Sequence, residues 1–249
     1  MKNTYPIVEI FGPVVQGEGE LAGLPTIFVR LGGCDYRCTQ CDTMYAVDTA
    51  RYKHQWQKLT AAEITNTVLA LADKGMGQNR PINVTFSGGN PALFDLVELI
   101  DTLRAAPRKF TLSMETQGSV YPEWAALLDH ICVSPKGPSM GYDMKAINLD
   151  VLGHYCSLWE HGVVPVYFKF VIGNRADLAL YLSLEDFLSD VPIYFQPVNT
   201  QLYSEEVDLN ILRQQYSDLV DLTLSSELYH VTVLPQLHVW ASGSNGRGI

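Results

Sequence analysis

Three cysteines lie close together near the amino-terminal end of the chain, with the spacing C-x3-C-x2-C at Cys34, Cys38 and Cys41. A structural zinc site takes four ligands, so it would need a distant fourth residue. The other two cysteines are poor candidates: Cys132 lies in an apolar stretch typical of a buried strand, and Cys156 lies in a predicted helix. A [4Fe–4S] cluster usually takes four thiolates, and with three it keeps one iron open to another ligand. The spacing therefore favours an iron–sulfur cluster over zinc.

Other polar groups follow predicted strands. The stretch "SGGNP" begins at Ser87, and its two glycines allow the backbone to approach a ligand closely. Further groups of this kind are Glu115-Thr116, Ser134-Pro135-Lys136, Lys169, Gln196-Pro197 and Pro235-Gln236 with His238. In parallel β/α folds, ligands bind at the carboxyl ends of the strands. We therefore predict that these groups form one active-site rim together with the cysteine loop.

The elements that must position this rim alternate along the chain. Short β-rich runs are expected at 26–31, 82–87, 110–116, 131–134, 166–172, 193–198 and 229–235. Amphipathic helices are expected at 59–75, 92–105, 122–130, 176–190 and 209–224, the first with a capping box of Thr60 and Glu63. This alternation predicts an α/β fold with a mostly parallel sheet and crossover helices. A partial or complete β/α barrel is favoured, and a doubly wound open sheet is the alternative.

Composition narrows the class of protein. The chain has 249 residues and a formal net charge of −10, so nucleic acid is not expected as a partner because its binding needs a basic surface. The sequence shows no signal peptide and no apolar run long enough to cross a membrane. Five cysteines, three of them clustered, do not resemble a secreted disulfide framework. We expect a cytoplasmic protein of one domain, 1–249, that binds a small ligand.

The cysteine spacing, followed one β/α unit later by "SGGNP", resembles the radical S-adenosylmethionine (SAM) superfamily. Within it, "EIFGPVVQGEGELAGLPTIFVRLGGCDYRCTQCDT", "METQGSVY", "SPKGPS" and the terminal "VLPQLHV…GSNGRGI" resemble the 7-carboxy-7-deazaguanine synthases nearly from end to end. Two residues depart from the pattern. Gln40 stands where the superfamily usually has an aromatic residue, and Asn90 stands where relatives often have glutamate.

The resemblance implies a carbon–nitrogen lyase of queuosine biosynthesis. Such an enzyme converts 6-carboxy-5,6,7,8-tetrahydropterin to 7-carboxy-7-deazaguanine with loss of ammonia, by hydrogen abstraction and radical ring contraction. The implied cofactors are a [4Fe–4S] cluster, SAM and Mg²⁺. The implied fold is an incomplete TIM-like β/α barrel. A homodimer and an electron donor of the flavodoxin or ferredoxin type are also implied.

The resemblance also implies a role for individual residues. The cluster ligands would be Cys34, Cys38 and Cys41 in the cluster loop, 32–47, and the Mg²⁺ ligand would be Thr43. Substrate would be bound by Val15, Gln16, Gly17, Glu18, Arg30, Ser87, His238 and Ile249, the last through a tail, 241–249, that closes the site. SAM would be bound by Gln40, Cys41, Asp42, Gly88, Gly89, Asn90, Glu115, Ser134, Pro135, Lys136 and Gln196.

Two alternatives share the cysteine spacing. One is an activating enzyme that places a glycyl radical on a partner protein, and the other is a non-enzymatic iron–sulfur or zinc scaffold. The first would need a surface groove for a protein segment. The second has no use for the polar motifs at the strand ends. Turnover of the pterin without any protein substrate separates both from the synthase.

Overall fold

The computed structural model describes residues 3–75, 81–188, 190–204 and 206–244. One sheet of nine strands runs through these residues in the order β3-β1-β2-β4-β5-β6-β7-β8-β9. The strands are β1 Tyr5–Val15, β2 Pro25–Leu31, β3 Gln57–Leu59, β4 Ile82–Gly88, β5 Phe110–Thr116, β6 His130–Val133, β7 Val166–Ile172, β8 Ile193–Pro197 and β9 Thr232–Val233. From β2 to β9 all neighbours are parallel. The mostly parallel sheet predicted from the sequence is confirmed.

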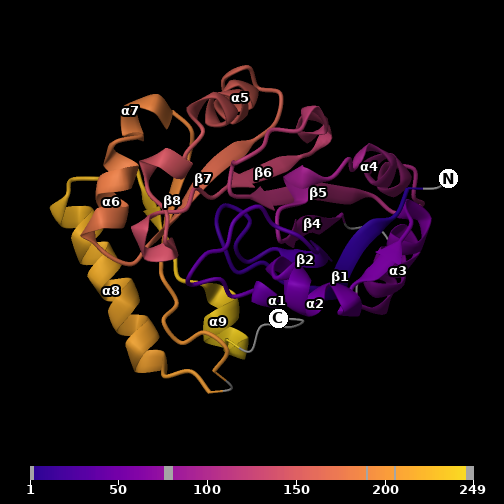
Figure 1. Ribbon diagram of the computed structural model, residues 1–249, viewed down its shortest axis with the longest axis horizontal. Coiled ribbons are helices and arrows are strands. Elements are labelled where there is room, and N and C mark those ends of the chain that lie inside the picture. Colours follow the sequence, from indigo (N-terminus) through magenta and orange to yellow (C-terminus); the bar gives the residue numbers. More distant parts are fainter. Residues whose placement is uncertain (1–2, 76–80, 189, 205, 245–249) are drawn as a thin grey trace.

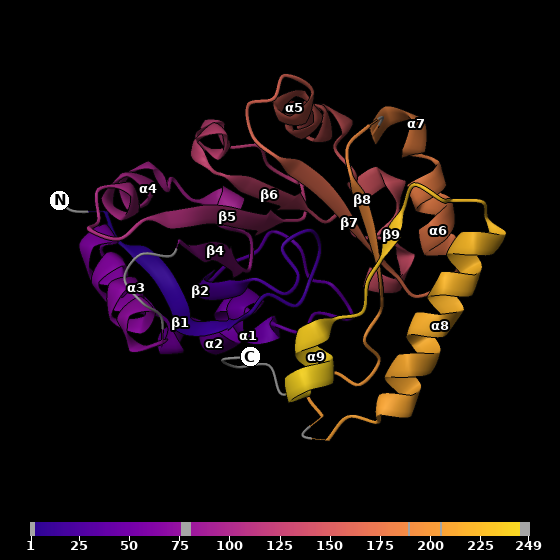
Figure 2. The same cartoon turned by 180° about the vertical axis from the view of Figure 1, so that it is seen from behind.

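The helices lie mainly on one side of this sheet. They are α1 Met44–Val47, α2 Thr49–Tyr52, α3 Ala61–Gly75, α4 Val97–Arg104, α5 Leu149–Glu160, α6 Arg175–Leu182, α7 Glu185–Leu188, α8 Leu209–Ser225 and α9 Leu237–Ser242. Helices α3 to α8 follow the outer side of the curved sheet, whereas α1 and α9 lie at its open inner side (Figures 1 and 2). Strands β3 and β9 end the sheet without pairing to each other. The fold is therefore a partial β/α barrel, as predicted.

The start of α3 shows how the sequence sets an element boundary. The backbone N–H of Thr60 donates to Glu63 Oε2 at 2.8 Å, and that of Glu63 donates to Thr60 Oγ1 at 3.4 Å. This is the predicted capping box, which satisfies amide groups that have no partner inside the helix. Ile64, Val68 and Ala72 recur every four residues and are fully buried. The spacing turns one face of the helix onto the sheet.

Several predicted elements are shorter than expected. The helix expected at 122–130 is a 3-10 helix, Glu123–Leu127, and the strand expected at 229–235 pairs only at β9. The helix expected at 92–105 begins at Val97, after a 3-10 turn, Pro91–Leu93, that Asn90 caps. The Trp124 indole N–H donates to Phe94 O at 2.8 Å across the two connections. Tertiary anchoring of this kind overrides the local helical pattern.

Two further differences concern segments that the pattern misjudged. The helix expected at 176–190 is interrupted, because α6 ends at Leu182 and buried Leu184 lies between it and α7. Strands β1 and β3 were not predicted. They form an antiparallel extension of the sheet beside β2.

None of the helices in the described ranges has the length and apolarity to cross a bilayer.

Candidate active site

A cavity of about 220 Å³ lies at the carboxyl ends of the parallel strands. It gathers nearly all the residues predicted for the site. On its wall are the three clustered cysteines and Val15, Gln16, Gly17, Glu18, Arg30, Gln40, Asp42, Thr43, Ser87, Gly88, Gly89, Glu115, Ser134, Lys136 and His238. The wall also includes Gln236 of the predicted rim and Ser244 of the predicted tail, and three residues that no prediction assigned to the site, Tyr36, Gln117 and Asn199. Lys169 lies on the wall as well; the sequence pattern predicted it at the rim without a role in binding or catalysis.

Strand alternation explains how one sheet supplies this wall. Successive side chains of a strand point to opposite faces. In β2 the apolar residues Ile27, Val29 and Leu31 belong to the core under the helices, whereas Arg30 lines the cavity. Arg30 is paired in register with Ser87 of β4, which lines the cavity as well. The polar residues of the parallel strands therefore converge inside the partial barrel.

The cluster loop is fastened along its length. Gly33 N–H donates to Ala46 O at 2.7 Å, and Tyr36 OH donates to Ala146 O at 2.6 Å. The Tyr36 ring stacks on Tyr142, with the ring centroids 4.3 Å apart. Thr39 N–H also donates to a backbone carbonyl, that of Met140, at 3.1 Å. The segment after β6 thus holds the loop against the cavity.

Burial makes the three thiols hard to ionise on their own. It raises the pKa of Cys34 and of Cys41 to about 11, and it raises the pKa of Cys38 as well. Thiolates in such surroundings need a cationic partner, and bound iron provides one. Within the described ranges, no three His, Cys, Asp or Glu side chains are grouped closely enough for one metal ion. Iron–sulfur ligands need no such convergence, because each thiolate binds a different iron of the cluster.

The glycine turn after β4 packs directly on the cluster loop. Gly89 N–H donates to Leu31 O at 3.0 Å, and Asn90 N–H donates to Gly33 O at 2.8 Å. A Cβ atom added at Gly89 would lie 1.9 Å from Gly33 O. Gly88 has a φ of +113°, which L side chains rarely adopt. Both glycines are therefore required for the close approach of the two loops, besides any contact with a ligand.

The Asn90 side chain is fully buried and does not line the cavity. Its Nδ2 donates to Asp35 Oδ1 and to Ser119 Oγ, both at 3.1 Å. Its Oδ1 accepts from Thr116 Oγ1 at 2.9 Å and from Ala92 N–H at 3.2 Å. The departure from glutamate has a local reason, because a carboxylate could not donate to Asp35.

Pro135 and Gln196 are likewise absent from the cavity wall. The predicted direct SAM contacts of Asn90, Pro135 and Gln196 therefore have no support from the wall.

The predicted substrate contact of Ser87 does have such support. The Ser87 Oγ is buried and has no hydrogen-bond partner in the described part of the chain. Buried polar groups are nearly always paired, so an unpaired hydroxyl on a cavity wall is suited to a ligand.

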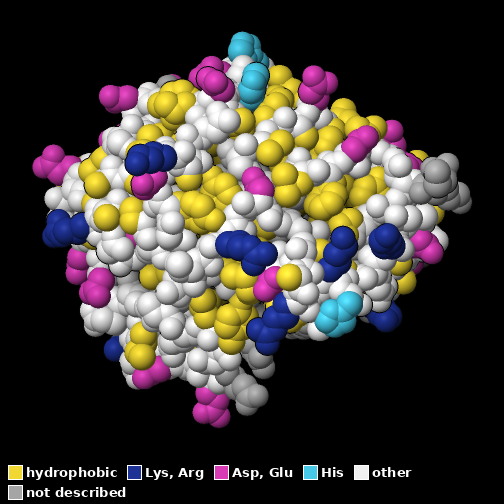
Figure 3. Space-filling view, in the orientation of Figure 1, with side chains coloured by type: hydrophobic (Ala, Val, Ile, Leu, Met, Phe, Trp, Pro, Cys, Tyr) yellow, Lys and Arg dark blue, Asp and Glu magenta, His cyan; other side chains and the backbone are white. Residues whose placement is uncertain are grey.

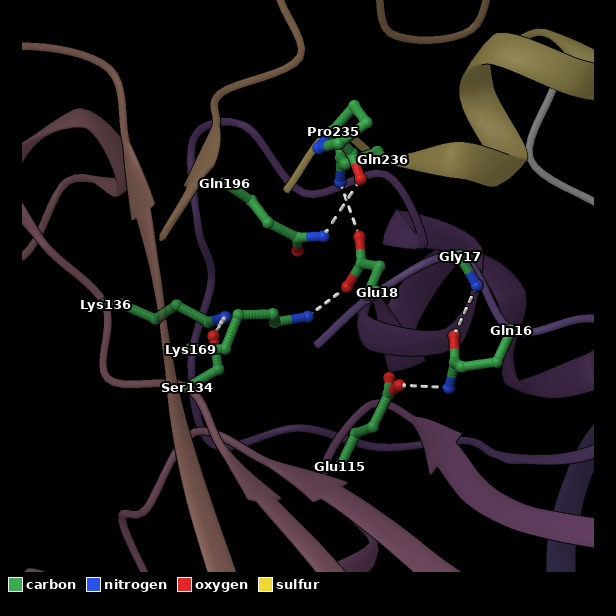
Figure 4. A network of polar contacts seen from close by, with 10 residues as sticks. All are labelled: Gln16, Gly17, Glu18, Glu115, Ser134, Lys136, Lys169, Gln196, Pro235 and Gln236. Carbon is green, nitrogen blue, oxygen red and sulfur yellow. Dashed lines mark hydrogen bonds and ion pairs between the residues drawn. The ribbon is translucent and has the colours of Figure 1, made fainter. Parts of the chain in front are cut away.

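Glu18 stands at the centre of a buried network that joins distant parts of the chain (Figure 4). Its Oε2 forms an ion pair with Lys169 Nζ of β7, and its Oε1 accepts from Gln236 Nε2 at 2.6 Å. Burial would raise the pKa of Glu18, but the charges of Lys169 and His238 and the hydrogen bonds from Lys169 and Gln236 together outweigh burial and lower it to about 2. Burial would lower the pKa of Lys169, and Glu18 in turn raises it above its ordinary value. A lone lysine in the apolar run "VYFKFVI" was the sequence feature that could have identified this residue.

The loop between β1 and β2 carries further site residues. Gln16 Nε2 donates to Glu115 Oε1 at 2.9 Å, and Gln16 Oε1 accepts from Gly17 N–H at 2.8 Å (Figure 4). Leu237 N–H donates to Gly17 O at 3.0 Å, where α9 begins. A Cβ atom at Gly17 would lie 2.2 Å from His238 Nδ1. Glycine at position 17 thus lets His238 reach the cavity.

Arg30 forms an ion pair and also lines the cavity. Its Nε pairs with Glu9 Oε1 at 2.8 Å, and Tyr45 OH donates to the same oxygen at 2.9 Å. The guanidinium carbon lies 5.3 Å from the ring centroid of Phe11 and 5.8 Å from that of Tyr45. In the described part of the chain the two terminal guanidinium nitrogens make no hydrogen bond, although Arg30 lines the cavity. They leave a planar fork open to a carboxylate.

Thr43 precedes α1 at the N-cap position, but its side chain makes no capping hydrogen bond. Its Oγ1 lies 3.7 Å from Cys41 Sγ and it lines the cavity. Lys136 Nζ, on the same wall, donates to Ser134 Oγ at 2.9 Å. The hydroxyl of Thr43 and the ammonium of Lys136 thus flank the cysteine cluster.

The beginning of the carboxyl-terminal tail also reaches the cavity. Ser244 is buried on its wall, where Asn199 Nδ2 donates to Ser244 Oγ at 2.6 Å. Tyr203 N–H donates to Ser244 O at 3.1 Å, and Tyr203 OH donates to Cys41 O at 2.6 Å. Tyr203 thus ties the tail to the cluster loop. The predicted substrate contact of Ile249 lies outside the described residues.

Comparison with known proteins identifies relatives of the chain. Residues 28–138 match the model of the radical SAM superfamily. The whole chain is 36% identical to all of the 7-carboxy-7-deazaguanine synthase of Bacillus subtilis (strain 168). It is 31% identical to the enzyme of that name from Bacillus cereus, with 98% of each chain covered.

Solved structures show the same fold. The crystal structure of QueE from Escherichia coli aligns with a TM-score of 0.66 at 20% identity, covering 94% of this chain and 95% of that one. The structure of anSMEcpe with bound AdoMet and the Kp18Cys peptide aligns with a TM-score of 0.55 at 15% identity. It covers 84% of this chain and 63% of that one.

Proposed function

This chain belongs to the 7-carboxy-7-deazaguanine synthase family of radical SAM enzymes, and on that premise we propose how its residues convert 6-carboxy-5,6,7,8-tetrahydropterin to 7-carboxy-7-deazaguanine and ammonia. The observation that carries the proposal is the single cavity on which the three cysteines, the glycine turn and the Arg30 fork meet. A glycyl-radical activating enzyme would also need the cysteines and the glycine turn, but it has no need of the Arg30 fork, and a scaffold needs neither the turn nor the fork. The described residues share one nine-stranded sheet, which supports a single domain.

The cofactor side of the cavity is formed by the cluster loop and the glycine turn. When bound, the [4Fe–4S] cluster and SAM supply the radical that abstracts hydrogen from the substrate. Cys34, Cys38 and Cys41 would hold the cluster, and Lys136 would pair with the carboxylate of SAM. The remaining SAM contacts would come from Gln40, Asp42, Gly88, Gly89, Glu115 and Ser134. Asn90 acts at a distance, by holding the glycine turn against Asp35.

The substrate side is formed by the loop after β1 and by β2 and β4. Arg30 presents its open fork to the substrate carboxylate, which it binds in two parallel hydrogen bonds. Glu18 and Gln16 read the polar edge of the pterin ring, with the backbone of Val15 and Gly17 beside them. Ser87 Oγ gains its missing hydrogen-bond partner from the substrate. His238 and the tail toward Ile249 complete the enclosure, which excludes water from the radical chemistry.

Thr43 is the proposed protein ligand of Mg²⁺. Its hydroxyl is a hard oxygen donor, and Mg²⁺ typically keeps several waters and takes other ligands from the substrate. The hydroxyl does not cap α1, and its hydrogen bond with Cys41 Sγ leaves an oxygen lone pair for the ion. The ion would offset the negative charge of the substrate carboxylate during ring contraction.

A protein electron donor of the flavodoxin or ferredoxin type would approach the outer side of the cluster loop. Figure 3 shows Lys and Arg side chains gathered over α1, α2 and the neighbouring loops, on a chain whose formal net charge is −10. Arg37, Arg51 and Lys53 are exposed in this region. Such cations favour an acidic carrier. A homodimer and a cytoplasmic location are proposed on the family resemblance, and the five free thiols are compatible with a reducing compartment.

The proposal is tested by anaerobic reconstitution with iron and sulfide, followed by assays for 5′-deoxyadenosine and for 7-carboxy-7-deazaguanine, with and without the pterin. We expect product from the pterin alone, with no protein substrate. Cys38→Ala should lose the cluster absorbance and all product. Cys156→Ala removes a buried thiol of α5 outside the cavity and should retain both. A wild-type protein that binds a single zinc ion, or one that turns over only with a protein substrate, would contradict the proposal.

A further inference from the structure

Lys169 has no role in the chemistry described so far, although it lines the cavity and forms a buried ion pair with Glu18. We infer that Lys169 is a positioning residue that determines specificity, because it holds Glu18 as an acceptor-only carboxylate for the N–H edge of the pterin ring. The inference rests on the proposed function. It adds Lys169 to the residues of the site, and it states the substrate feature that the site selects, the N–H edge of the ring.

The geometry fixes the carboxylate from two sides. The side chain of Lys169 is 7% exposed and that of Glu18 is 13% exposed, so solvent has little access to the pair. Lys169 binds Oε2, and Gln236 Nε2 binds Oε1 at 2.6 Å. An ionised carboxylate can accept about four hydrogen bonds, two on each oxygen. One acceptor position on each oxygen therefore remains for a ligand in the cavity.

Both remaining positions suit a particular chemical group. A pterin carries its 2-amino group beside the ring N3–H, so this edge presents two donors side by side. A carboxylate accepts from both, whereas a protonated carboxyl group presents a donor of its own and accepts at one oxygen only. A lumazine, which has an oxygen in place of the 2-amino group, would set that oxygen against the carboxylate. A site that hydrogen-bonds a substrate group rejects an analogue lacking it, because buried polar groups are then left unpaired.

Lys169 is the charged group that keeps Glu18 ionised, as the other groups around the pair show. His238 of α9 also faces Glu18, while Glu115 of β5 and Cys132 of β6 interact with Lys169 from the neighbouring strands. Burial alone would raise the pKa of Glu18. Removing the Lys169 cation would leave burial opposed only by His238 and by the hydrogen bond from Gln236, so the pKa of Glu18 would rise and the carboxylate would take up a proton as the pH falls. The wild-type carboxyl stays ionised throughout the neutral range, with a pKa of about 2.

The experiment measures binding of oxidised 6-carboxypterin and 6-carboxylumazine to the reconstituted enzyme with SAM, by equilibrium dialysis between pH 5.5 and 8.5. The wild type should prefer the pterin by about tenfold or more, the value of one hydrogen bond to a charged group. Lys169→Met should lose most of this preference, and its affinity for the pterin should fall further as the pH is lowered. Lys169→Arg keeps the cation and should retain the preference and the wild-type pH profile.

Three controls separate the charge effect from general damage. Lys58→Met removes an exposed lysine of β3 and should bind as the wild type does. His238→Gln removes the other titratable group that faces Glu18, and Lys169→Met should add the same pH dependence in this background. In a Glu18→Gln background Lys169→Met should add none. If Lys169→Met does not fold, Lys169→Gln replaces it with the same expectations.

The failures of the two proposals are distinguishable. A wild type that does not bind or convert the pterin overturns the proposed function. A wild type that does both, with Lys169→Met retaining the pterin preference and the wild-type pH profile, overturns the inference alone. A purely structural lysine would lower the content of folded protein without changing the pH dependence of binding in the molecules that remain.

Discussion

The helix that Thr43 precedes does not use its hydroxyl as a cap, and the hydrogen bond between this hydroxyl and Cys41 Sγ, at 3.7 Å, leaves an oxygen lone pair to bind a metal ion. Thr43→Ala should therefore reduce the activation of the enzyme by Mg²⁺ about tenfold or more. Its free energy of unfolding should change by less than about 0.5 kcal/mol, whereas loss of a true cap would cost about 1 kcal/mol. Thr43→Ser should retain the Mg²⁺ response, measured as initial rate against Mg²⁺ concentration. An unchanged response in Thr43→Ala would place the ion elsewhere.

The side chain of Asn90 hydrogen-bonds to neighbouring residues and does not line the cavity. Asn90→Glu would set two acceptors against each other, since Asp35 now accepts from the Asn90 amide at 3.1 Å. Loss of this buried network should lower the free energy of unfolding by about 2–4 kcal/mol. Asp35→Asn in the same chain should restore part of the loss, because an amide can donate to the new carboxylate. Denaturant unfolding measures the stability of both variants. If Asn90→Glu alone is as stable as the wild type, the hydrogen bond between Asn90 and Asp35 does not contribute to stability.

At the scale of elements, the close contact between the cluster loop and the turn after β4 depends on Gly89. A methyl group there would lie 1.9 Å from Gly33 O, so Gly89→Ala must push the two loops apart. We expect the reconstituted variant to bind well under half the iron of the wild type. Gly153→Ala in α5 is the matched control, since the added Cβ would meet only Phe187 of α7, at an ordinary distance of 3.6 Å. Equal iron content in both variants would show that the contact does not hold the cluster.

The elements also show which parts of the fold the sequence could predict. The parallel strands were found because each is a short apolar run ended by polar residues, as in 110–116. Strand β1 was missed because it is only half-buried and contains Gly12-Pro13, and proline is confined to strand edges and irregular positions. Its pairing with β2 is irregular at that point. Lys169 was found near the rim but not recognised as half of an ion pair, because its partner lies 151 residues away.

For the whole molecule, the cavity is assembled from segments that no local pattern connects. The loop after β1 meets the start of α9 through the hydrogen bond of Gln236 to Glu18, 218 residues apart. The site residues could be predicted one by one from motifs that resemble a family. The contacts between them could not, because they depend on how the partial barrel curves. Tyr203, which bonds both the tail and Cys41, has no local feature that would identify it.

The tail provides the last test, because Ser244, the last described residue before Ile249 in the sequence, lines the cavity wall. If the terminal carboxylate serves the substrate site, residues appended after Ile249 should lower kcat/KM for the pterin about tenfold or more, since a lost charged hydrogen bond has that value. An equal extension at the amino terminus should have no effect. Asn199→Ala, which removes the hydrogen bond to Ser244, should raise KM in the untagged protein. Equal kcat/KM values for the two tagged proteins would show that the tail carboxylate takes no part, and Ser244 would then only close the wall of the cavity.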